Sequence, residues 1–407
     1  MTKYLYAILL LSTFLFISCD SQHGGNKTVD QAIKKVKQEY APDSRTAIFQ
    51  VSYHIDGNKV DLRGETNLSV ARDALIKKLK ASNSNRDIDD NIVLLPDKNL
   101  NGDLYGVVDL SACNIRTHPH FASELSTQST LGTVVRVYKK NKNGEWYYIQ
   151  TPDKYLGWVD SGGITLMNKS QYDNWMKNPK VIYTKEYGNS YQKPDPDAQH
   201  VSDLVEGNIL EDLGTAGNFV KVKYPDERIA YIPSKYVMRF SKWLSDRKPT
   251  AHNVIKTAKK FIGIPYLWGG TSPKGVDCSG FTKTAFYLNG IILPRDASQQ
   301  AEVGVPVPTD TTLKNLKPGD LLFFGKKATK NHKADIVHVA LYLGNGKFIN
   351  SAGTVKIESL KRGDKNFNAY RLRTFVGARR LLNNIGKHGV ERIQASGFYK
   401  LKSQTKM

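Results

Sequence analysis

One cysteine in the C-terminal third of the chain has the setting of a reactive nucleophile. Cys278 follows a glycine-rich stretch and lies in the segment Asp277-Cys278-Ser279-Gly280. Apolar helical spacing resumes at Phe281, which predicts that Cys278 lies in the first turn of a helix. Unpaired backbone N–H groups and the helix dipole favour a thiolate at such a position. We therefore interpret Cys278 as a nucleophile.

A thiol nucleophile needs an imidazole, and the imidazole needs an acceptor that orients it. The alternating run 335–344 predicts a strand with His338 on the face opposite Val337 and Val339. A second strand then carries Asn350. A three-residue loop between the strands places Asn350 diagonal to His338 on one face, whereas a two-residue loop turns it to the other face. The order Cys, His, Asn is the one that a thiol peptidase with a neutral orienting amide requires.

The other two cysteines have different expected roles. Residues 1–18 contain one lysine and an apolar run that is too short to span a bilayer but suits a signal peptide. The run ends at Cys19, as in a bacterial lipobox, which predicts lipidation of Cys19 and a polar tether over 19–26; an ordinary signal peptide with a chance cysteine is the alternative. Cys113 is expected to be buried and inert. Neither a disulfide framework nor a zinc site is indicated, and we expect no metal and no cofactor.

Length and charge limit the classes of function. The chain has 407 residues, so several domains are expected, and its net charge is +21. Such a charge favours acidic partners. Because the leader predicts export, wall polymer or lipid headgroups fit better than nucleic acid, for which there is no motif.

The segments before the cysteine region are predicted to form three small domains. Residues 27–105 read as a small α+β domain with helices over 30–40 and 68–79 and a hairpin that begins at 47–55. Short strands follow from 106. Residues 146–159 align without gaps to 219–232, an offset of 73 that predicts two copies of a small β-barrel, over 106–172 and 173–242.

The repeat also serves as an internal comparison. Tyr155 in the first copy is matched by Arg228 in the second, so the barrel itself does not require an aromatic residue there. Tyr155 is therefore a candidate functional residue. Residues 243–250 read as a linker, 253–262 as a helix, and 386–407 as a loosely packed basic tail.

Five motifs in order resemble the NlpC-type cell-wall cysteine peptidases: Pro265-Tyr-Leu-Trp-Gly-Gly, Asp277-Cys-Ser-Gly-Phe, Leu293-Pro-Arg-Asp, Pro318-Gly-Asp-Leu and His338-Val-Ala-Leu-Tyr-Leu-Gly. The resemblance implies an α+β chain with a papain-like catalytic domain over 243–385, preceded by the small α+β domain and two barrels that resemble bacterial Src-homology-three-like modules. By position, Cys278 is the nucleophile and His338 the general base and acid. Asn350 falls where this family usually has a second histidine.

With two barrels ahead of it, the catalytic domain resembles the γ-D-glutamyl-L-diamino acid endopeptidases (dipeptidyl-peptidase VI-like enzymes). These cut peptidoglycan stem peptides between D-Glu and the diamino acid (lysine or diaminopimelate) and prefer a free L-Ala amine. The resemblance implies an ammonium-binding group of six residues: Glu124, Tyr155, Tyr266, Asp277, Ser279 and, as a weaker match, Ser298. A solvated Glu124 and an Asp277 that only caps the helix are the alternatives. The basic loop 326–333 is expected to be a solvated surface loop.

Three functional hypotheses follow. The first is an exported, lipid-anchored cysteine endopeptidase that trims released wall peptides. The second is a hydrolase of intact peptidoglycan whose barrels anchor it to the wall. The third is a wall-binding scaffold whose peptidase fold has decayed, which only Asn350 supports.

Overall fold

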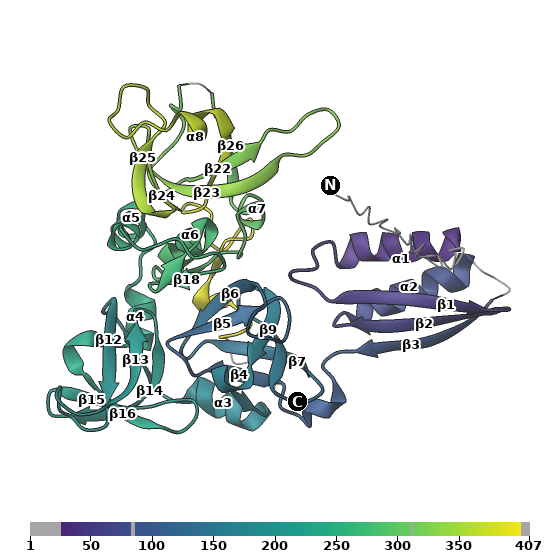
Figure 1. Ribbon diagram of the computed structural model, residues 1–407, viewed down its shortest axis with the longest axis horizontal. Coiled ribbons are helices and arrows are strands. Elements are labelled where there is room, and N and C mark those ends of the chain that lie inside the picture. The colour runs from purple at the N-terminus through teal and green to yellow at the C-terminus, as the bar shows by residue number, and fades with distance from the viewer. Residues whose placement is uncertain (1–25, 83–85, 311, 400–407) are drawn as a thin grey trace, which may run out of the picture.

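The computed structural model describes residues 26–82, 86–310 and 312–399, which form four packed units (Figure 1). The predicted signal peptide and Cys19 lie outside the described residues, as does the tether apart from Asn26. Asn26 caps the first helix, because its side chain accepts the N–H groups of Thr28 and Val29. Among the described residues, no helix is both long and apolar enough to cross a membrane.

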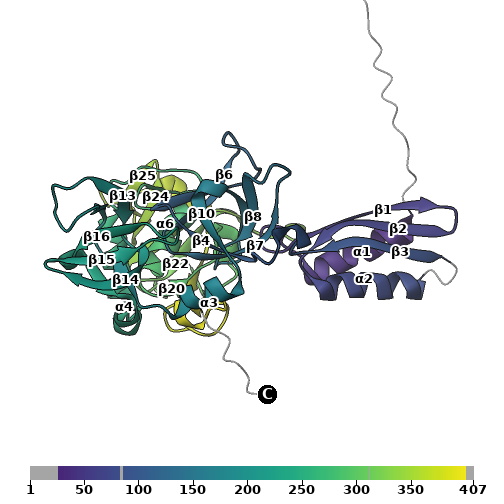
Figure 2. The same ribbon diagram turned by 90° about the horizontal axis from the view of Figure 1, so that it is seen from below.

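The N-terminal domain is a three-stranded sheet with two helices on one face (Figure 2). Its strands lie in the order β1-β2-β3, with β1 and β2 antiparallel and β2 and β3 parallel. The helix–hairpin–helix order expected from the sequence is confirmed, whereas the third strand was not predicted. The elements are α1 (Lys27–Tyr40), β1 (Phe49–Asp56), β2 (Lys59–Thr66), α2 (Ser69–Ser82) and β3 (Asp87–Leu94).

Two seven-stranded sheets follow, one for each copy of the repeat. The first has the order β10-β4-β7-β8-β9-β5-β6 and contains β4 (Tyr105–Val108), β5 (Ala112–Arg116), β6 (Leu125–Thr130), β7 (Val134–Lys140), β8 (Trp146–Gln150), β9 (Leu156–Asp160) and β10 (Ile164–Met167). The helix α3 (Lys169–Lys177) leads to the second, of order β13-β12-β16-β15-β14-β11-β17. It contains β11 (Lys180–Tyr183), β12 (Tyr187–Tyr191), β13 (His200–Val205), β14 (Ile209–Ala216), β15 (Phe219–Lys223), β16 (Ile229–Pro233) and β17 (Val237–Arg239).

The sequence repeat corresponds to one hairpin in each of these sheets. The hairpin β8–β9 occupies the first copy and β15–β16 the second, and the start and end of each strand agree with the 73-residue offset. Three of the matched pairs are core positions in both copies: Trp146 and Phe219, Ile149 and Val222, and Val159 and Ile232. The match of Leu156 with Ile229 is not, because Ile229 is 40% exposed.

The catalytic domain has a six-stranded sheet of order β21-β26-β22-β23-β24-β25 with helices on both faces: the first three helices pack against one face, and the last packs against the other through Leu372. Its helices are α5 (Ala251–Lys260), α6 (Cys278–Tyr287), α7 (Ala297–Gln300) and α8 (Ala369–Thr374). The sheet contains β21 (Val305–Val307), β22 (Leu321–Lys326), β23 (Asp335–Gly344), β24 (Lys347–Ala352), β25 (Thr354–Ser359) and β26 (Phe375–Arg380), and β18 (Thr271–Ser272) and β19 (Gly275–Val276) form a small hairpin before α6.

Two expectations for this half of the chain are wrong. The predicted linker over 243–250 begins inside helix α4 (Phe240–Asp246), where Trp243 is buried. The predicted loose tail packs over its described part, 386–399: β27 (Glu391–Arg392) pairs with β20 (Ile291–Ile292), and Val390 and Ile393 are buried. The apolar side chains of these two segments lack a regular period, so their burial follows from tertiary packing and not from a local sequence pattern. In Figure 1 this yellow segment runs from the catalytic domain back to the first barrel.

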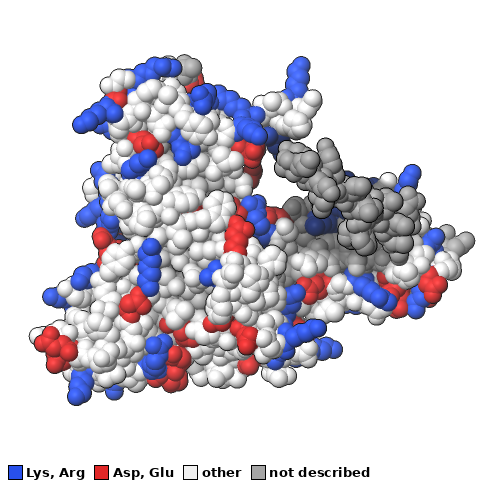
Figure 3. Space-filling model, viewed as in Figure 1, with Lys and Arg blue, Asp and Glu red and all other residues white. Residues whose placement is uncertain are grey.

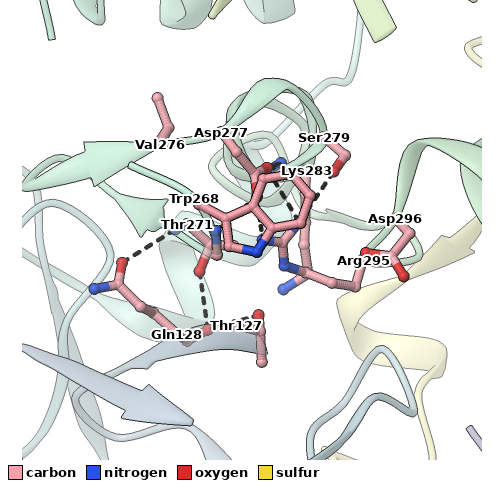
Figure 4. Close-up of polar contacts among 12 residues, drawn as sticks. Thr127, Gln128, Trp268, Thr271, Val276, Asp277, Ser279, Lys283, Arg295 and Asp296 are labelled. Carbon is pink, nitrogen blue, oxygen red and sulfur yellow. Dashed lines mark hydrogen bonds and ion pairs between the residues drawn. The ribbon is translucent and has the colours of Figure 1, made fainter. Parts of the chain in front are cut away.

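The first barrel is joined to the catalytic domain by a buried polar contact beside the nucleophile segment. The Oε1 of Gln128 in β6 accepts the Thr271 N–H at 3.1 Å, and its backbone carbonyl accepts the Thr271 hydroxyl at 2.9 Å (Figure 4). The ammonium group of Lys283 in α6 also pairs with Asp153 of the barrel at 3.3 Å. Since these groups are shielded from water, their pairing fixes the barrel's orientation on the catalytic domain.

On the face drawn in Figure 3, the basic side chains are spread over the surface rather than collected in one groove. In Figure 3, basic side chains lie across the visible face with acidic ones between them. The loop 327–333 between β22 and β23 is exposed throughout, as expected for a solvated surface loop.

Candidate active site

The helix α6 begins at Cys278, as the sequence predicts. Its cap is Asp277, whose Oδ1 accepts the N–H of Gly280 at 2.7 Å. The other oxygen, Oδ2, accepts the Gly269 N–H at 2.9 Å, which holds the glycine-rich loop against the helix start. The Asp277 carboxylate therefore holds the backbone on either side of Cys278, and Cys278 itself is 8% exposed.

Asp277 does more than cap this helix, because it forms an ion pair with the fully buried Arg295. The guanidinium donates to both carboxylate oxygens, and its Nη1 also donates to the Ser279 hydroxyl at 3.0 Å. Arg295 therefore balances the charge of Asp277 beneath the nucleophile. Asp277 and Ser279 also line the cavity beside Cys278.

The structure brings His338 and Asn350 together. The Nε2 of His338 lies 2.8 Å from the Oδ1 of Asn350, and both side chains are buried. The loop between their strands combines the two alternatives. It has two residues, Asn345 and Gly346, both with positive φ, and a bulge at Leu343 then restores the register expected for a three-residue loop. Asn350 therefore lies on the same face as His338 and diagonal to it, although the loop has two residues.

A carboxylate fixes the orientation of the Asn350 amide. The Oε2 of Glu358 in β25 accepts from the Nδ2 of Asn350 at 2.9 Å, so the amide oxygen is turned toward His338. The same carboxylate accepts from Asn368 at 2.8 Å through its other oxygen. This arrangement gives His338 a fixed acceptor, which is the requirement for an orienting group in a thiol peptidase.

The sulfur of Cys278 lies against the His338 strand. The backbone N–H groups of Val339 and Ser279 both act to lower the pKa of Cys278. Burial has the larger effect and, with the Asp277 charge, raises this pKa to about 11. Burial also lowers the pKa of His338 to about 3, assisted by the charge of Arg371.

This charge state corrects the expectation that the helix start holds a thiolate. With the thiol pKa raised and the imidazole pKa lowered, both groups are neutral around pH 7 in the substrate-free cleft. The reason is desolvation, which disfavours either charge and outweighs the N–H groups of Val339 and Ser279 at the sulfur.

Cys278 opens onto a cavity of about 500 Å³ between the catalytic domain and the first barrel. All six residues of the implied ammonium-binding group line it: Glu124, Tyr155, Tyr266, Asp277, Ser279 and Ser298. The Tyr155 hydroxyl donates to the Oδ2 of Asp296 at 3.0 Å. Burial, followed by Cys278 and Asp277, raises the pKa of Tyr266 to about 12, so this hydroxyl remains a donor at neutral pH.

Glu124 lies at the exposed rim of this cavity and is held by an aromatic side chain. The indole Nε1 of Trp268 donates to the Oε1 of Glu124 at 2.7 Å, and Trp268 is 62% exposed. In Figure 4 the indole ring lies in front of Asp277 and Arg295. The Glu124 carboxylate is thus positioned by the catalytic domain rather than simply solvated.

Four residues at the site were missed as functional candidates. Arg295 and Asp296 belong to the quoted motif Leu293-Pro-Arg-Asp, and Trp268 to the quoted Trp-Gly-Gly, so the motifs carried the signal. Arg45 comes from the N-terminal domain and lines the same cavity. No local pattern marks it.

The remaining cysteine of the described residues is structural. Cys113 is 2% exposed in the core of the first barrel, and burial raises the pKa of its thiol to about 12. Over the part of the chain that the structure describes, no three His, Cys, Asp or Glu side chains are grouped to hold a metal ion.

Comparisons with known proteins agree with this arrangement. Residues 263–374 match the NlpC/P60 family, and residues 115–164 match the bacterial dipeptidyl-peptidase Sh3 domain. A gamma-D-glutamyl-L-lysine dipeptidyl-peptidase of Bacillus cereus is 30% identical over 275 residues, 64% of this chain and 76% of that protein. Dipeptidyl-peptidase 6 of Lysinibacillus sphaericus is 28% identical over 251 residues, 60% of this chain and 87% of that protein.

Solved structures show the same fold. An NlpC/P60 family protein from Bacillus cereus superposes with a TM-score of 0.57 at 26% identity, covering 68% of this chain and 99% of that one. An NlpC/P60 endopeptidase from Photobacterium damselae subsp. piscicida has a TM-score of 0.51 at 18% identity, covering 70% of this chain and 72% of that one, and shares the fold.

Proposed function

Because this chain belongs to the NlpC/P60 family of cysteine peptidases, we propose that it hydrolyses the γ-D-glutamyl–L-diamino acid bond of peptidoglycan stem peptides with a free N-terminal L-alanine. The names of its relatives support this bond. The observation that carries the proposal is the cavity beside Cys278, into which the first barrel inserts a carboxylate and a tyrosine.

In this proposal, Cys278 and His338 carry out two successive acyl transfers. The Cys278 sulfur attacks the γ-carbonyl carbon of D-Glu, and His338 takes the thiol proton. His338 then returns this proton to the departing amine of the diamino acid as the C–N bond breaks, which leaves a thioester. Water attacks the thioester with His338 as base, and the sulfur leaves to give L-Ala-D-Glu and the free enzyme. Asn350 holds the imidazole in position through both steps.

The substrate's ammonium group is proposed to bind at the first barrel. Removing an ammonium from water is costly unless carboxylates and hydrogen-bond acceptors replace the hydration. Glu124 supplies a carboxylate at the rim, and Tyr155 and Ser279 line the interior of the same cavity. An acylated amine carries no charge to balance Glu124, so it is bound less well.

The test is a mass spectrum of L-Ala-γ-D-Glu-L-Lys, and of the diaminopimelate peptide, after incubation with the protein. We expect L-Ala-D-Glu and the free diamino acid with wild type and intact peptide with Cys278→Ala. Equal, negligible conversion by both proteins would instead favour the decayed scaffold. The 2.8 Å contact between His338 and Asn350 is an argument against that scaffold.

N-acetylation of the L-alanine separates the proposal from hydrolysis of intact wall. In intact peptidoglycan this amine is acylated, so an enzyme of intact wall cleaves the acetylated tripeptide well. We expect cleavage of the acetylated peptide to collapse. Equal rates on both peptides would favour the wall hydrolase.

We also propose that the protein is exported and anchored to the cell envelope by a lipid on Cys19. This rests on the lipobox-like sequence at 16–19. Labelling cells with a clickable palmitate analogue should mark the wild-type protein and not Cys19→Ala. Labelling of both would contradict the anchor at this residue.

A further inference from the structure

The loop between α1 and β1 carries the N-terminal domain into the catalytic cavity. Arg45 of this loop lines the cavity together with Cys278 and Tyr155. Its Nη1 donates to the Oδ2 of Asp296 at 2.7 Å, the same oxygen that accepts the Tyr155 hydroxyl at 3.0 Å. The Nη1 also lies 3.2 Å from the hydroxyl of Ser298. The guanidinium is therefore next to the residues proposed to bind the ammonium group.

Asp43 holds the guanidinium of Arg45 in a fixed orientation. Its two carboxylate oxygens accept from Nε and Nη2, each at 2.8 Å. Gln299 of the catalytic domain donates to the same carboxylate at 2.8 Å. A bidentate pair of this kind restricts both the position and the plane of the guanidinium.

The backbone of the loop is docked on the first barrel. The Leu156 N–H donates to the Arg45 carbonyl at 2.8 Å, and the Gln150 amide donates to the Thr46 carbonyl at 2.8 Å. A buried apolar cluster lies beside these bonds and joins the two domains: Ile48, Leu95, Tyr138 and Leu156. The loop thus lies across this end of the cavity as a docked element rather than a free surface loop.

The charges at this end remain favourable for a cation. Arg45 contributes one positive charge and brings Asp43 with it, so together with Asp296 the three side chains sum to −1. Most of the guanidinium N–H groups are already used by Asp43, Asp296 and Ser298, which leaves little for a substrate carboxylate. The arrangement therefore suits a wall that carries its own counter-charge better than an anion-binding site.

We infer that Arg45 forms the end wall of the cleft beyond the ammonium-binding residues and limits the substrate to one residue before γ-D-Glu. The inference rests on the proposed function. The N-terminal domain then acts as a measuring element: a peptide with one more residue would have to place about 3.5 Å more chain where the guanidinium lies. The barrel residues bind the charged amine, and Arg45 limits how far this amine can lie from the scissile bond.

A glycyl extension tests length without removing charge. The substrates are L-Ala-γ-D-Glu-L-Lys and Gly-L-Ala-γ-D-Glu-L-Lys, both with a free ammonium group. For wild type we expect kcat/KM at least 100-fold lower on the extended peptide. The measured quantity is the ratio of kcat/KM on the tripeptide to kcat/KM on the extended peptide. For Arg45→Ala we expect this ratio to fall at least tenfold, because the absolute kcat/KM on the extended peptide rises.

Two further variants control for indirect effects. Arg63→Ala removes an exposed arginine from β2 of the same domain and should leave the ratio as in wild type. Arg45→Lys keeps a long cationic side chain and should retain most of the discrimination. A merely structural role for Arg45 would lower kcat/KM on both peptides equally and leave their ratio unchanged.

The outcomes separate the two proposals. If wild type and Arg45→Ala cleave the tripeptide but share one ratio, the end wall is refuted and the proposed function stands. If wild type itself cleaves the extended peptide as well as the tripeptide, the end wall is likewise refuted. If wild type cleaves neither peptide, both proposals fall.

Discussion

The acceptor of His338 is Asn350, which lies where the family pattern has a second histidine. The Asn350 oxygen is fixed because the Asn350 Nδ2 is held by Glu358. Each contact lies on a neighbouring strand of one sheet, so the chain β23–β24–β25 sets the angle of the imidazole. The amide that contacts His338 is therefore held in place although it carries no charge.

Replacing Asn350 by alanine should therefore lower kcat more than it raises KM. The imidazole would lose its acceptor and rotate away from the sulfur, and positioned proton transfer contributes about 10²–10⁴-fold to rate. We expect kcat on L-Ala-γ-D-Glu-L-Lys to fall by about 10²-fold. Lys347→Ala, an exposed change on the same strand, is the matched control. A wild-type kcat in Asn350→Ala would show that the amide has no orienting role.

The raised pKa of Cys278 predicts slow alkylation at neutral pH. A thiol with a pKa of about 11 is mostly protonated at pH 7, and its thiolate fraction grows about tenfold per pH unit. The rate of iodoacetamide labelling at Cys278 should rise by about that factor from pH 7 to 8 and again to 9. Peptide mass spectrometry measures it, with Cys278→Ala as the blank. A plateau already below pH 8 would mean that a thiolate exists in the free enzyme.

At the scale of elements, the helix α6 and the glycine-rich loop before it bring the barrel to the nucleophile. Gly269 has a φ of +80°, and a Cβ built there would lie 2.3 Å from the Leu125 carbonyl oxygen of β6. Only a residue without a side chain allows the barrel to approach this closely. The glycine thus serves the domain contact as well as the turn.

Gly269→Ala should consequently cost more than Gly263→Ala. Gly263 has a similar φ of +90° but nothing within 4 Å of its Cβ position, so both changes carry the backbone cost of about 1–2 kcal/mol and only the first adds a clash. We expect a larger fall in Tm and in kcat/KM for Gly269→Ala. Equal losses of Tm and kcat/KM in the two variants would mean that the barrel shifts to accept the added methyl group without disturbing the site.

At the scale of the whole molecule, three of the four units meet at one cavity. The catalytic domain supplies the nucleophile, the first barrel supplies Glu124 and Tyr155, and the N-terminal domain supplies Arg45. The second barrel supplies no lining residue, and its Arg228, at the position of Tyr155, pairs with Asp226 of its own hairpin. Of the two copies of this fold, the first therefore lines the cavity and the second does not.

Glu124→Gln should weaken binding of the free amine without disturbing the architecture. Glutamine keeps an oxygen for the Trp268 indole, but the negative charge is lost. Since hydrogen bonds to charged groups contribute about 1.5–3 kcal/mol, we expect KM for L-Ala-γ-D-Glu-L-Lys to rise about tenfold or more. The acetylated peptide should be cleaved at the same low rate by wild type and Glu124→Gln. Glu145→Gln, on the same barrel outside the cavity, should behave as wild type; a KM unchanged in Glu124→Gln would remove Glu124 from the site.

The sequence by itself determined the local features. The helix start at Cys278, the strand with His338 and the barrel repeat all follow from periodicity and turn residues, which act over a few positions. Tertiary structure decided the rest. Arg45 and Asp296 meet across 251 residues of chain, and the packed tail and the buried Trp243 have no period of their own. The charge state of Cys278 was decided in the same way, because desolvation depends on how completely other segments cover the sulfur, and no local pattern records that.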